Sequence, residues 1–311
     1  MPLTKILDVE SVRFAAPDLD KMREFLIDFG LSQSEDTGDG ILRMRGTGDA
    51  PFVHETVEGE PSFIAVTLRA DSLADLDALA EHENVSVENA PGPGGGRMVS
   101  LVDPDGFTVE VVAAKARANE LPHGTRDAWN VIGRRERPGA TKRLTAGPAG
   151  VVRLGHVVLG VTDMEATWKW WQDRFGLLVS DEVRAPSGDL AALFIRCDRG
   201  AEPVDHHTLN FASVPGMPAK FHHAAFEVAD LDDLMAGSQF LESRGYRHDW
   251  GVGRHILGSQ VFDYWRDPWG HRVEHWTDGD LFDASVPPNV TDLQTMMGHQ
   301  WGPAAPADFV S

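Results

Sequence analysis

Histidine is spread very unevenly along this chain. Only three of its 13 histidines precede residue 150, and the other ten follow it. His156 and His223 each stand near the start of an apolar segment, and Glu274 follows an Asp-Pro-Trp-Gly turn. Two imidazoles and one carboxylate form the facial triad of non-haem Fe(II) enzymes, which leaves positions open for substrate and oxygen. We therefore predict a metal centre in the second half of the chain.

The His222-His223 pair leaves a choice of ligand. Alternate side chains of a strand point to opposite faces, so His223, Ala225 and Glu227 share one face and His222 takes the other. His223 is therefore the favoured ligand, with His222 as the alternative. Histidines near strand ends are also commonly structural, and spacing alone leaves that interpretation open.

The chain contains an internal repeat. Residues 18–31 and 163–177 each follow an apolar strand and end in Phe-Gly-Leu, and the Asp-Pro-Asp-Gly turn at 103–106 is echoed at 267–270. Landmarks that recur in the same order indicate duplication of one structural unit. Each copy is expected to run as a strand, a helix and several strands, followed by the same pattern again.

The repeat sets the expected domain boundaries. A segment rich in Gly, Pro and Arg interrupts the pattern between the two copies, and the last residues have little periodicity. We expect that final segment to lie over the second domain. The predicted parts are an N-terminal non-catalytic domain at 1–115, a linker at 116–150, a catalytic domain at 151–285 and a tail at 286–311.

Two local signals fix elements of the second copy. Thr162 with Glu165 three residues later has the pattern of a helix N-cap and capping box, and Gly176 ends the helix. A three-residue hairpin loop at 268–270 would place Tyr264 directly opposite Glu274. A four-residue turn would instead pair Asp263 with Glu274 and point Tyr264 away.

The first copy lacks a ligand set of its own. Aligning the two first helices puts Ser11 at the first ligand position, or Glu10 with one gap, and Ile64 or Ala65 at the second. Only Glu110 is retained. One carboxylate does not hold iron, so the first domain is predicted to be structural.

The second half resembles the type I extradiol ring-cleavage dioxygenases of the vicinal-oxygen-chelate superfamily. Its family motifs are a His that opens the strand before the first helix, a His-His-x-x-Phe-Glu-Val segment and Pro-x-Gly-x-x-x-Glu. Matched residue by residue, this resemblance implies His156, His223 and Glu274 as the metal ligands. It covers about 150–285 strongly and 5–115 as scaffold only.

Three further positions match the family. Tyr264 lies ten residues before Glu274, His255 stands in a Gly-Arg-His segment, and His207 stands in Asp-His-His-Thr-Leu. The resemblance implies that His255 and Tyr264 accept the diol proton or hold the deprotonated oxygen. It implies that His207 stabilises dioxygen and donates a proton during O–O cleavage.

The resemblance also implies a fold and a reaction. The fold is α+β, with two tandem domains of paired βαβββ modules, each pair forming a curled sheet around a pocket. The reaction is extradiol cleavage of a catechol-type diol with O2 in aromatic catabolism, at Fe(II) with Mn(II) as the alternative metal, in a homo-oligomer. Residues expected to line the substrate pocket are Leu193, Phe194, Trp250, Ile256 and the tail.

Composition narrows the functional classes. A formal net charge of −20 argues against partners with phosphate backbones or anionic membrane surfaces. No apolar run reaches the roughly 20 residues of a membrane span, and the N-terminus lacks a signal-peptide pattern. The single cysteine, Cys197, fits a reducing cytoplasm. The alternatives are a glyoxalase- or thiol-transferase-like metal enzyme and a non-enzymatic drug-binding resistance protein.

Overall fold

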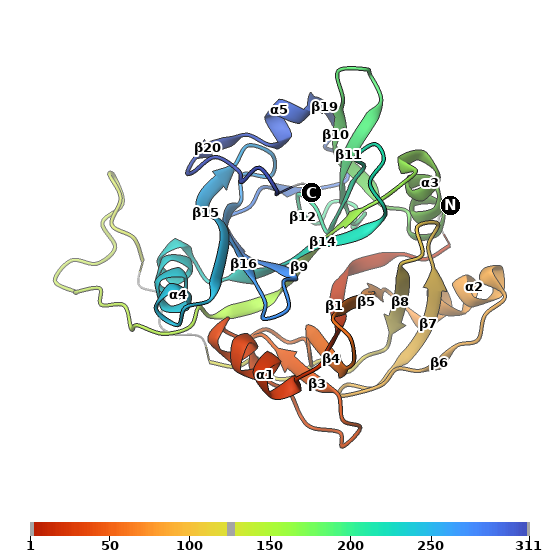
Figure 1. The fold of residues 1–311 in the computed structure, drawn as a ribbon, viewed down its shortest axis with the longest axis horizontal. Helices are drawn as coiled ribbons and strands as arrows, with labels where there is room; N and C mark the ends of the chain where they lie inside the picture. The colour runs from red at the N-terminus through yellow and green to blue at the C-terminus, as the bar shows by residue number, and fades with distance from the viewer. Residues whose placement is uncertain (1–2, 123–127, 310–311) are drawn as a thin grey trace.

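The computed structural model describes residues 3–122 and 128–309. These residues form an eight-stranded sheet, a ten-stranded sheet and a small two-stranded sheet, with helices on the outside (Figure 1). The predicted α+β architecture is confirmed, because each large sheet contains the βαβββ pattern twice. Residues 123–127 of the predicted linker and 310–311 of the predicted tail lie outside the described residues.

The eight-stranded sheet is built from the first half of the chain. Its strand order is β2-β3-β4-β1-β5-β8-β7-β6, so the first strands of its two modules, β1 and β5, lie side by side and antiparallel. The elements are β1 (Ile6–Ala16), α1 (Leu19–Asp28), β2 (Ser32–Gln33), β3 (Leu42–Arg45), β4 (His54–Glu58), β5 (Ser62–Ala70), α2 (Leu73–Glu83), β6 (Glu88–Asn89), β7 (Arg97–Val102) and β8 (Thr108–Ala113).

The ten-stranded sheet repeats this plan in the second half and adds two strands from the tail. Its order is β19-β10-β11-β13-β9-β14-β17-β16-β15-β20, and β12 pairs with β18 separately. The elements are β9 (Val151–Gly160), α3 (Met164–Phe175), β10 (Leu178–Arg184), β11 (Leu190–Arg196), β12 (Val204–Asp205), β13 (Leu209–Ala212), β14 (Lys220–Val228), α4 (Leu231–Ser243), β15 (Arg247–His255), β16 (Val261–Arg266), β17 (Arg272–Thr277), β18 (Leu281–Phe282), β19 (Asn289–Asp292), α5 (Leu293–Met296) and β20 (His299–Trp301).

The predicted cap of α3 is wrong by one residue. Asp163 caps the helix, because its carboxylate accepts a hydrogen bond from the backbone N–H of Ala166 at 3.0 Å. Thr162 instead donates from its backbone N–H and its hydroxyl to Asp105, at 2.7 and 2.5 Å. Asp105 belongs to the Asp-Pro-Asp-Gly turn at 103–106 in the first half of the chain. The Thr162 hydroxyl is therefore bound in a tertiary contact, which a local sequence pattern does not predict.

The hairpin register is confirmed. Strands β16 and β17 pair antiparallel with Tyr264 directly opposite Glu274. Gly270 closes the loop with a φ of +94°, a left-handed conformation that favours glycine, and the Asp267 carboxylate accepts from the backbone N–H groups of Trp269 and His271. This turn chemistry sets the register that turns Tyr264 toward the predicted ligand.

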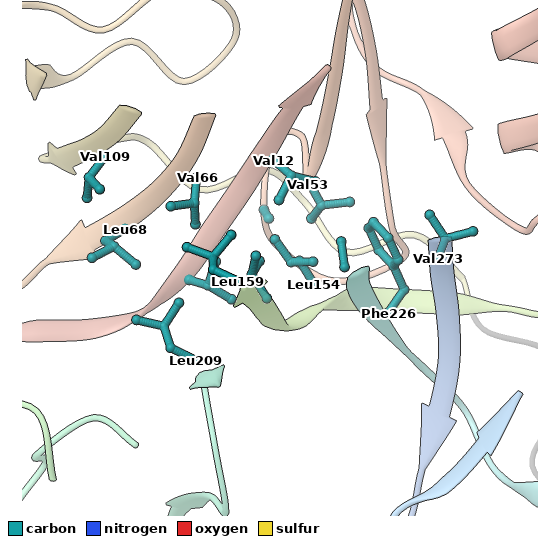
Figure 2. Packing of buried hydrophobic residues seen from close by; sticks show 14 of the residues in the cluster. Val12, Val53, Val66, Leu68, Val109, Leu154, Leu159, Leu209, Phe226 and Val273 are labelled. Atoms are coloured by element: carbon teal, nitrogen blue, oxygen red, sulfur yellow. The ribbon is translucent and has the colours of Figure 1, made fainter. Parts of the chain in front are cut away.

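The two halves share one hydrophobic core. Figure 2 shows side chains of β1 and β5, such as Val12 and Val66, gathered with Leu154, Leu159 and Phe226 of β9 and β14. All five are at most 1% exposed. Burial of this apolar surface between the two sheets fixes their relative position.

The first half also contacts the strand that carries Glu274. His275, the next residue on β17, is fully buried, and its Nε2 donates to the backbone carbonyl of Phe29 at 2.7 Å. Its ring stacks on the Phe29 ring with centroids 3.8 Å apart. The N-terminal half therefore packs against β17 through the contacts of Phe29 with His275.

The position equivalent to the metal site in the first half is closed by ion pairs. In the paired strands Ser11, Ala65 and Glu110 occupy the register positions of His156, His223 and Glu274. Arg13 donates to both oxygens of Glu110, at 2.7 and 3.0 Å. Thr67 donates to the same carboxylate at 3.1 Å. Its acceptor capacity is thus taken up by the protein itself.

The tail lies on the second half, as expected. Strand β19 pairs with β10, strand β20 pairs with β15, and Phe309 returns toward the interior of the large sheet. Among the described residues, none of the helices has the length and apolar character needed to cross a membrane.

Candidate metal centre

Three side chains from three neighbouring strands meet inside the ten-stranded sheet. His156 on β9, His223 on β14 and Glu274 on β17 each offer one atom to a group in which all lie within 4.8 Å of one another. Glu274 Oε2 is 3.3 Å from His156 Nε2 and 3.2 Å from His223 Nε2. All three residues are buried. The structure thus brings together the three predicted ligands.

The donor atoms fit a divalent cation. His223 Nε2 and both Glu274 oxygens are shielded from solvent and have no hydrogen-bond partner. Burial raises the pKa of Glu274 above its usual range, although His156 and Tyr264 act to lower it. A buried carboxylate without a partner is unfavourable, and a cation held by the three residues would compensate for it. Imidazole and carboxylate suit Fe(II) and Mn(II).

His222 contradicts the simple strand alternation. A β-bulge interrupts the pairing of β14 with β9 between Phe221 and His223, and both histidines line the same cavity. The two Nδ1 atoms lie 2.7 Å apart. If His223 binds a metal through Nε2, its Nδ1–H donates to His222 Nδ1, since a neutral imidazole has one N–H. His222 is then the hydrogen-bond partner that orients a ligand.

The tail continues this chain of hydrogen bonds. In the tautomer just assigned, His222 Nε2 donates to the backbone carbonyl of Phe309 at 2.7 Å. Arg272 donates to the same carbonyl at 2.9 Å. Burial, with the nearby Arg272 charge, lowers the pKa of His222 to about 3, so the ring is neutral. The Phe309 carbonyl is thus the acceptor that this tautomer requires, whereas Arg272 Nη1, which can only donate and lies 2.8 Å from the same His222 Nε2, favours the opposite tautomer.

His207 lies against the first ligand. Its ring centroid is 4.1 Å from that of His156, and its side chain lines the cavity. Burial and the neighbouring histidines lower the pKa of His207 well below its usual range. A neutral imidazole beside the predicted metal position can donate a hydrogen bond into the cavity from Nε2.

His255 and Tyr264 form a second polar pair on the opposite strands β15 and β16. The Tyr264 hydroxyl lies 3.0 Å from His255 Nε2. Burial and the Glu274 carboxylate raise the pKa of Tyr264 well above its usual range. Burial, with His156 and His299 nearby, lowers the pKa of His255 to about 3. Tyr264 therefore donates, and His255 Nε2 is the proton acceptor of the pair.

The ligand atoms open into a cavity of about 380 Å³. Phe194 and Trp250 line it as expected, whereas Leu193 and Ile256 do not. Most of the other lining side chains are aliphatic, aromatic or methionine, and these are Val158, Val161, Ala191, Ala212, Val214, Met217, Leu257, Leu293, Met296, Met297 and Phe309. Such a lining suits an apolar ring bound with its polar edge toward the ligands.

Sequence reasoning missed the groups behind His207. His206, to which no role was given, bonds both to His207 and to Asp181 on β10. Asn289 of the tail bonds to the same aspartate. The only signal in the sequence was the adjacency of the two histidines, because Asp181 is 25 residues away on another strand.

A family model matches the strands that carry these residues. Residues 153–275 match the Glyoxalase/Bleomycin resistance protein/Dioxygenase superfamily. This part of the chain is a domain of that superfamily. The superfamily match spans the second half and includes all six predicted site residues.

Similar proteins of known sequence are named as a metapyrocatechase and an extradiol dioxygenase. The chain is 33% identical over 213 residues to metapyrocatechase 2 of Cupriavidus necator, covering 68% of this chain and 62% of that protein. It is 27% identical over 155 residues to an iron-dependent extradiol dioxygenase of Rhodococcus jostii, covering 48% and 51%. The matches thus span less than two thirds of the length of these two relatives.

Solved structures share the fold over nearly the whole superfamily chain. A homoprotocatechuate 2,3-dioxygenase from Brevibacterium fuscum, in an anaerobic substrate complex, aligns with a TM-score of 0.81 and 19% identity, over 99% of this chain and 92% of that one. A Mn(II)-bound glyoxalase from Novosphingobium aromaticivorans aligns with a TM-score of 0.77 and 24% identity, over 97% and 93%. At these identities the likeness shows the fold alone.

Removal of the residues after Ala307 is expected to weaken metal binding. The deletion takes away the Phe309 carbonyl, so His222 Nε2 loses its acceptor, and the Arg272 donor 2.8 Å away then favours the tautomer in which His222 no longer accepts from His223 Nδ1. Loss of such a supporting hydrogen bond lowers metal affinity by roughly 10- to 100-fold. Competition with a chelator measures the Kd, and Phe309→Leu, which keeps the carbonyl, should bind like the wild type. Equal affinity of truncated and full-length protein would refute this coupling.

Proposed function

We propose that this protein is an extradiol dioxygenase that cleaves a catechol-type aromatic diol with O2 at Fe(II), and that Mn(II) can take the same place. The observation that carries the proposal is the buried triad of His156, His223 and Glu274 at the end of an apolar cavity. The names of the similar proteins support it. When bound, Fe(II) would hold the two adjacent diol oxygens and supply the redox chemistry that activates O2.

The apolar cavity wall orients the ring. A diol has its polar edge at one side of an apolar body, so burial of that body against residues such as Val158 and Trp250 directs the hydroxyls toward the triad. Leu293, Met296 and Phe309 bring the tail onto this cavity. They exclude water from the ring, and the wall that they form suits apolar substituents, while Lys220 brings a cation to another part of the cavity lining.

The polar pair of His255 and Tyr264 handles the first proton. A diol hydroxyl has a pKa near 10, so its ionisation at pH 7 requires a drop of about 3 units, or roughly 4 kcal/mol. His255 Nε2, 3.0 Å from the Tyr264 hydroxyl, accepts that proton as the diol takes the place of this hydroxyl. Burial, which lowers the pKa of His255 to about 3, opposes the transfer, and the negative charge of the adjacent diolate offsets it. The Tyr264 O–H then donates a hydrogen bond to the oxygen left behind.

His207 acts on the other side of the site. Its Nε2–H points into the cavity beside His156 and is available to dioxygen. It donates a hydrogen bond to the bound oxygen substrate and then the proton itself as the O–O bond breaks. Acid and base are thus separate residues, with His207 in the loop between β12 and β13 and His255 at the end of β15.

The proposal extends to organisation and location. We propose residues 1–115 as a supporting domain, 116–150 as its linker, 151–285 as the catalytic domain and 286–311 as a tail that closes the cavity. The lone buried thiol of Cys197 suits the cytoplasm, and a homo-oligomer is expected from family resemblance. Size-exclusion chromatography with light scattering tests the oligomeric state.

The reaction is tested by product analysis. Protein loaded anaerobically with Fe(II) is given a panel of catechols under ¹⁸O2. We expect oxygen uptake and a yellow semialdehyde or ketone product that carries two labelled oxygens, because cleavage adjacent to the diol leaves a conjugated enolate. Colourless muconates, or no oxygen uptake with any diol, would contradict extradiol cleavage. Activity on glutathione adducts of aldehydes instead would favour a glyoxalase.

A further inference from the structure

A buried chain of polar groups lies directly behind His207. His207 Nδ1 is 3.1 Å from His206 Nδ1, and His206 Nε2 is 2.7 Å from the Asp181 carboxylate. The other oxygen of that carboxylate accepts from Asn289 Nδ2 at 2.7 Å. Asp181, His206 and His207 are each at most 4% exposed. None of these contacts involves His156, His223 or Glu274.

The direction of the hydrogen bonds follows from Asp181. Burial acts to raise the pKa of this carboxyl, but the hydrogen bonds from His206 and Asn289 outweigh it and hold the pKa below its usual range. An ionised carboxylate is an acceptor only, so His206 Nε2 carries a hydrogen. Both ring nitrogens of His206 face hydrogen-bond acceptors when His207 carries its hydrogen on Nε2: Nε2 faces the Asp181 carboxylate at 2.7 Å and Nδ1 faces His207 Nδ1 at 3.1 Å. His206 Nδ1 can therefore also carry a hydrogen, which points at His207 Nδ1.

His207 needs this neighbour in order to act as an acid. With Nδ1 facing His206, the nitrogen toward the cavity is Nε2. A full positive charge on His207 would lie beside His156 and a bound divalent cation, which is electrostatically unfavourable. A neutral imidazole that gives up its only proton becomes an anion, which is also unfavourable. Both costs are avoided if Nδ1 gains a proton as Nε2 loses one.

We propose that Asp181 and His206 form a proton-supplying pair for His207, a role that rests on the proposed function. As the Nε2–H bond of His207 breaks and its proton passes to the oxygen substrate, the Nδ1–H bond of His206 breaks and a new N–H forms at His207 Nδ1. His207 stays neutral, and His206 changes from imidazolium to neutral imidazole. A solvent proton later enters at His207 Nε2, and the Nδ1 proton returns to His206.

The surroundings hold this pair in place. The backbone carbonyl of His206 accepts from the Ser180 hydroxyl at 2.5 Å, and its N–H donates to the Asp280 carbonyl at 2.9 Å. The Phe282 ring contacts the His206 ring edge-on. Proton transfer along the pair thus requires little movement of the protein, which is the condition for efficient transfer.

Asp181→Asn and His206→Gln are the test variants. Asn keeps the shape and an acceptor at 181 but removes the charge, and Gln removes the transferable proton. We expect kcat with a catechol to fall roughly 10²-fold in each, while metal content and KM stay within about twofold. The matched control is His248→Gln. His248 Nε2 lies 2.7 Å from an Asp263 carboxylate oxygen, the same distance as in the His206–Asp181 pair, but His248 does not line the cavity. That variant should keep the wild-type kcat.

The His207→Phe background separates proton supply from simple structural support. If the pair acts through His207, adding Asp181→Asn to His207→Phe should cause no further loss of kcat. An equal fractional loss in both backgrounds would overturn the proposal, as would wild-type kcat in both single variants. Wild-type protein that cleaves no diol would defeat the proposed function and this role with it. That result differs from a normal wild type with unaffected variants, which would defeat the pair alone.

A second measurement does not depend on turnover. Long-range ¹H–¹⁵N spectra of [¹⁵N]histidine-labelled protein loaded with diamagnetic Zn(II) report which nitrogens carry hydrogen. The His206 signals, assigned by their loss in His206→Gln, should show both nitrogens protonated, and Asp181→Asn should convert His206 to a neutral ring. A wild-type His206 that is neutral would refute the proton store.

Discussion

Protein carrying His156→Ala, His223→Ala or Glu274→Gln is expected to bind no metal after passage over a chelating resin and to show no ring cleavage. Each change removes one of three ligands, and among the described residues no other His, Cys, Asp or Glu belongs to the group of atoms that could hold a metal here. Two remaining donors do not hold the cation against competition from water and chelator. Elemental analysis of the purified variants gives the metal per chain, with one for the wild type.

Glu110→Gln is the matched control for Glu274→Gln. The two glutamates occupy the same register position in the two halves, but Arg13 and Thr67 already occupy the Glu110 carboxylate. The variant should therefore keep one metal per chain. Two metals in the wild type, or loss of metal in Glu110→Gln, would show that the first half contains a site after all.

His207→Phe and Tyr264→Phe are expected to keep the metal and lose turnover. Neither side chain is a ligand in the proposed site, so metal content should remain near one per chain. Removal of a positioned acid or hydrogen-bond donor lowers kcat by roughly 10²–10⁴. Steady-state oxygen uptake with a saturating catechol measures kcat, and anaerobic titration with the diol measures binding separately.

Tyr246→Phe is the control for Tyr264→Phe. These are the two tyrosines of the chain, and the Tyr246 hydroxyl donates to Asp28 at 2.8 Å, between α1 and α4 and away from the cavity. The Tyr246→Phe variant should lower the free energy of unfolding, because this hydrogen bond is lost, and should leave kcat unchanged. Wild-type rates in both His207→Phe and Tyr264→Phe would mean that these residues only pack against the site.

Local sequence patterns predicted the structure correctly where the geometry of a segment depends only on its own residues. The turn at 268–270 determines which residues of β16 and β17 face each other, so the Tyr264–Glu274 pairing could be predicted from turn length and strand alternation. The duplicated order of strands and helices likewise indicated two domains, each of which contains the pattern of a strand, a helix and several strands twice. The cap of α3 could not be located in this way, because Asp105 of the other half binds Thr162.

The sequence by itself determined which residue types could hold a metal, that only one half has the full set, and how the β16–β17 hairpin is paired. These follow from side-chain chemistry and from short-range geometry. Only the tertiary structure decided that a bulge turns His222 into the cavity, that the Phe309 carbonyl of the tail meets it, and that Asp181 lies behind His206. Each of these contacts joins segments far apart in the chain or depends on a backbone irregularity. Their positions are set by how the sheet curls and how the halves pack, which periodicity within one segment does not encode.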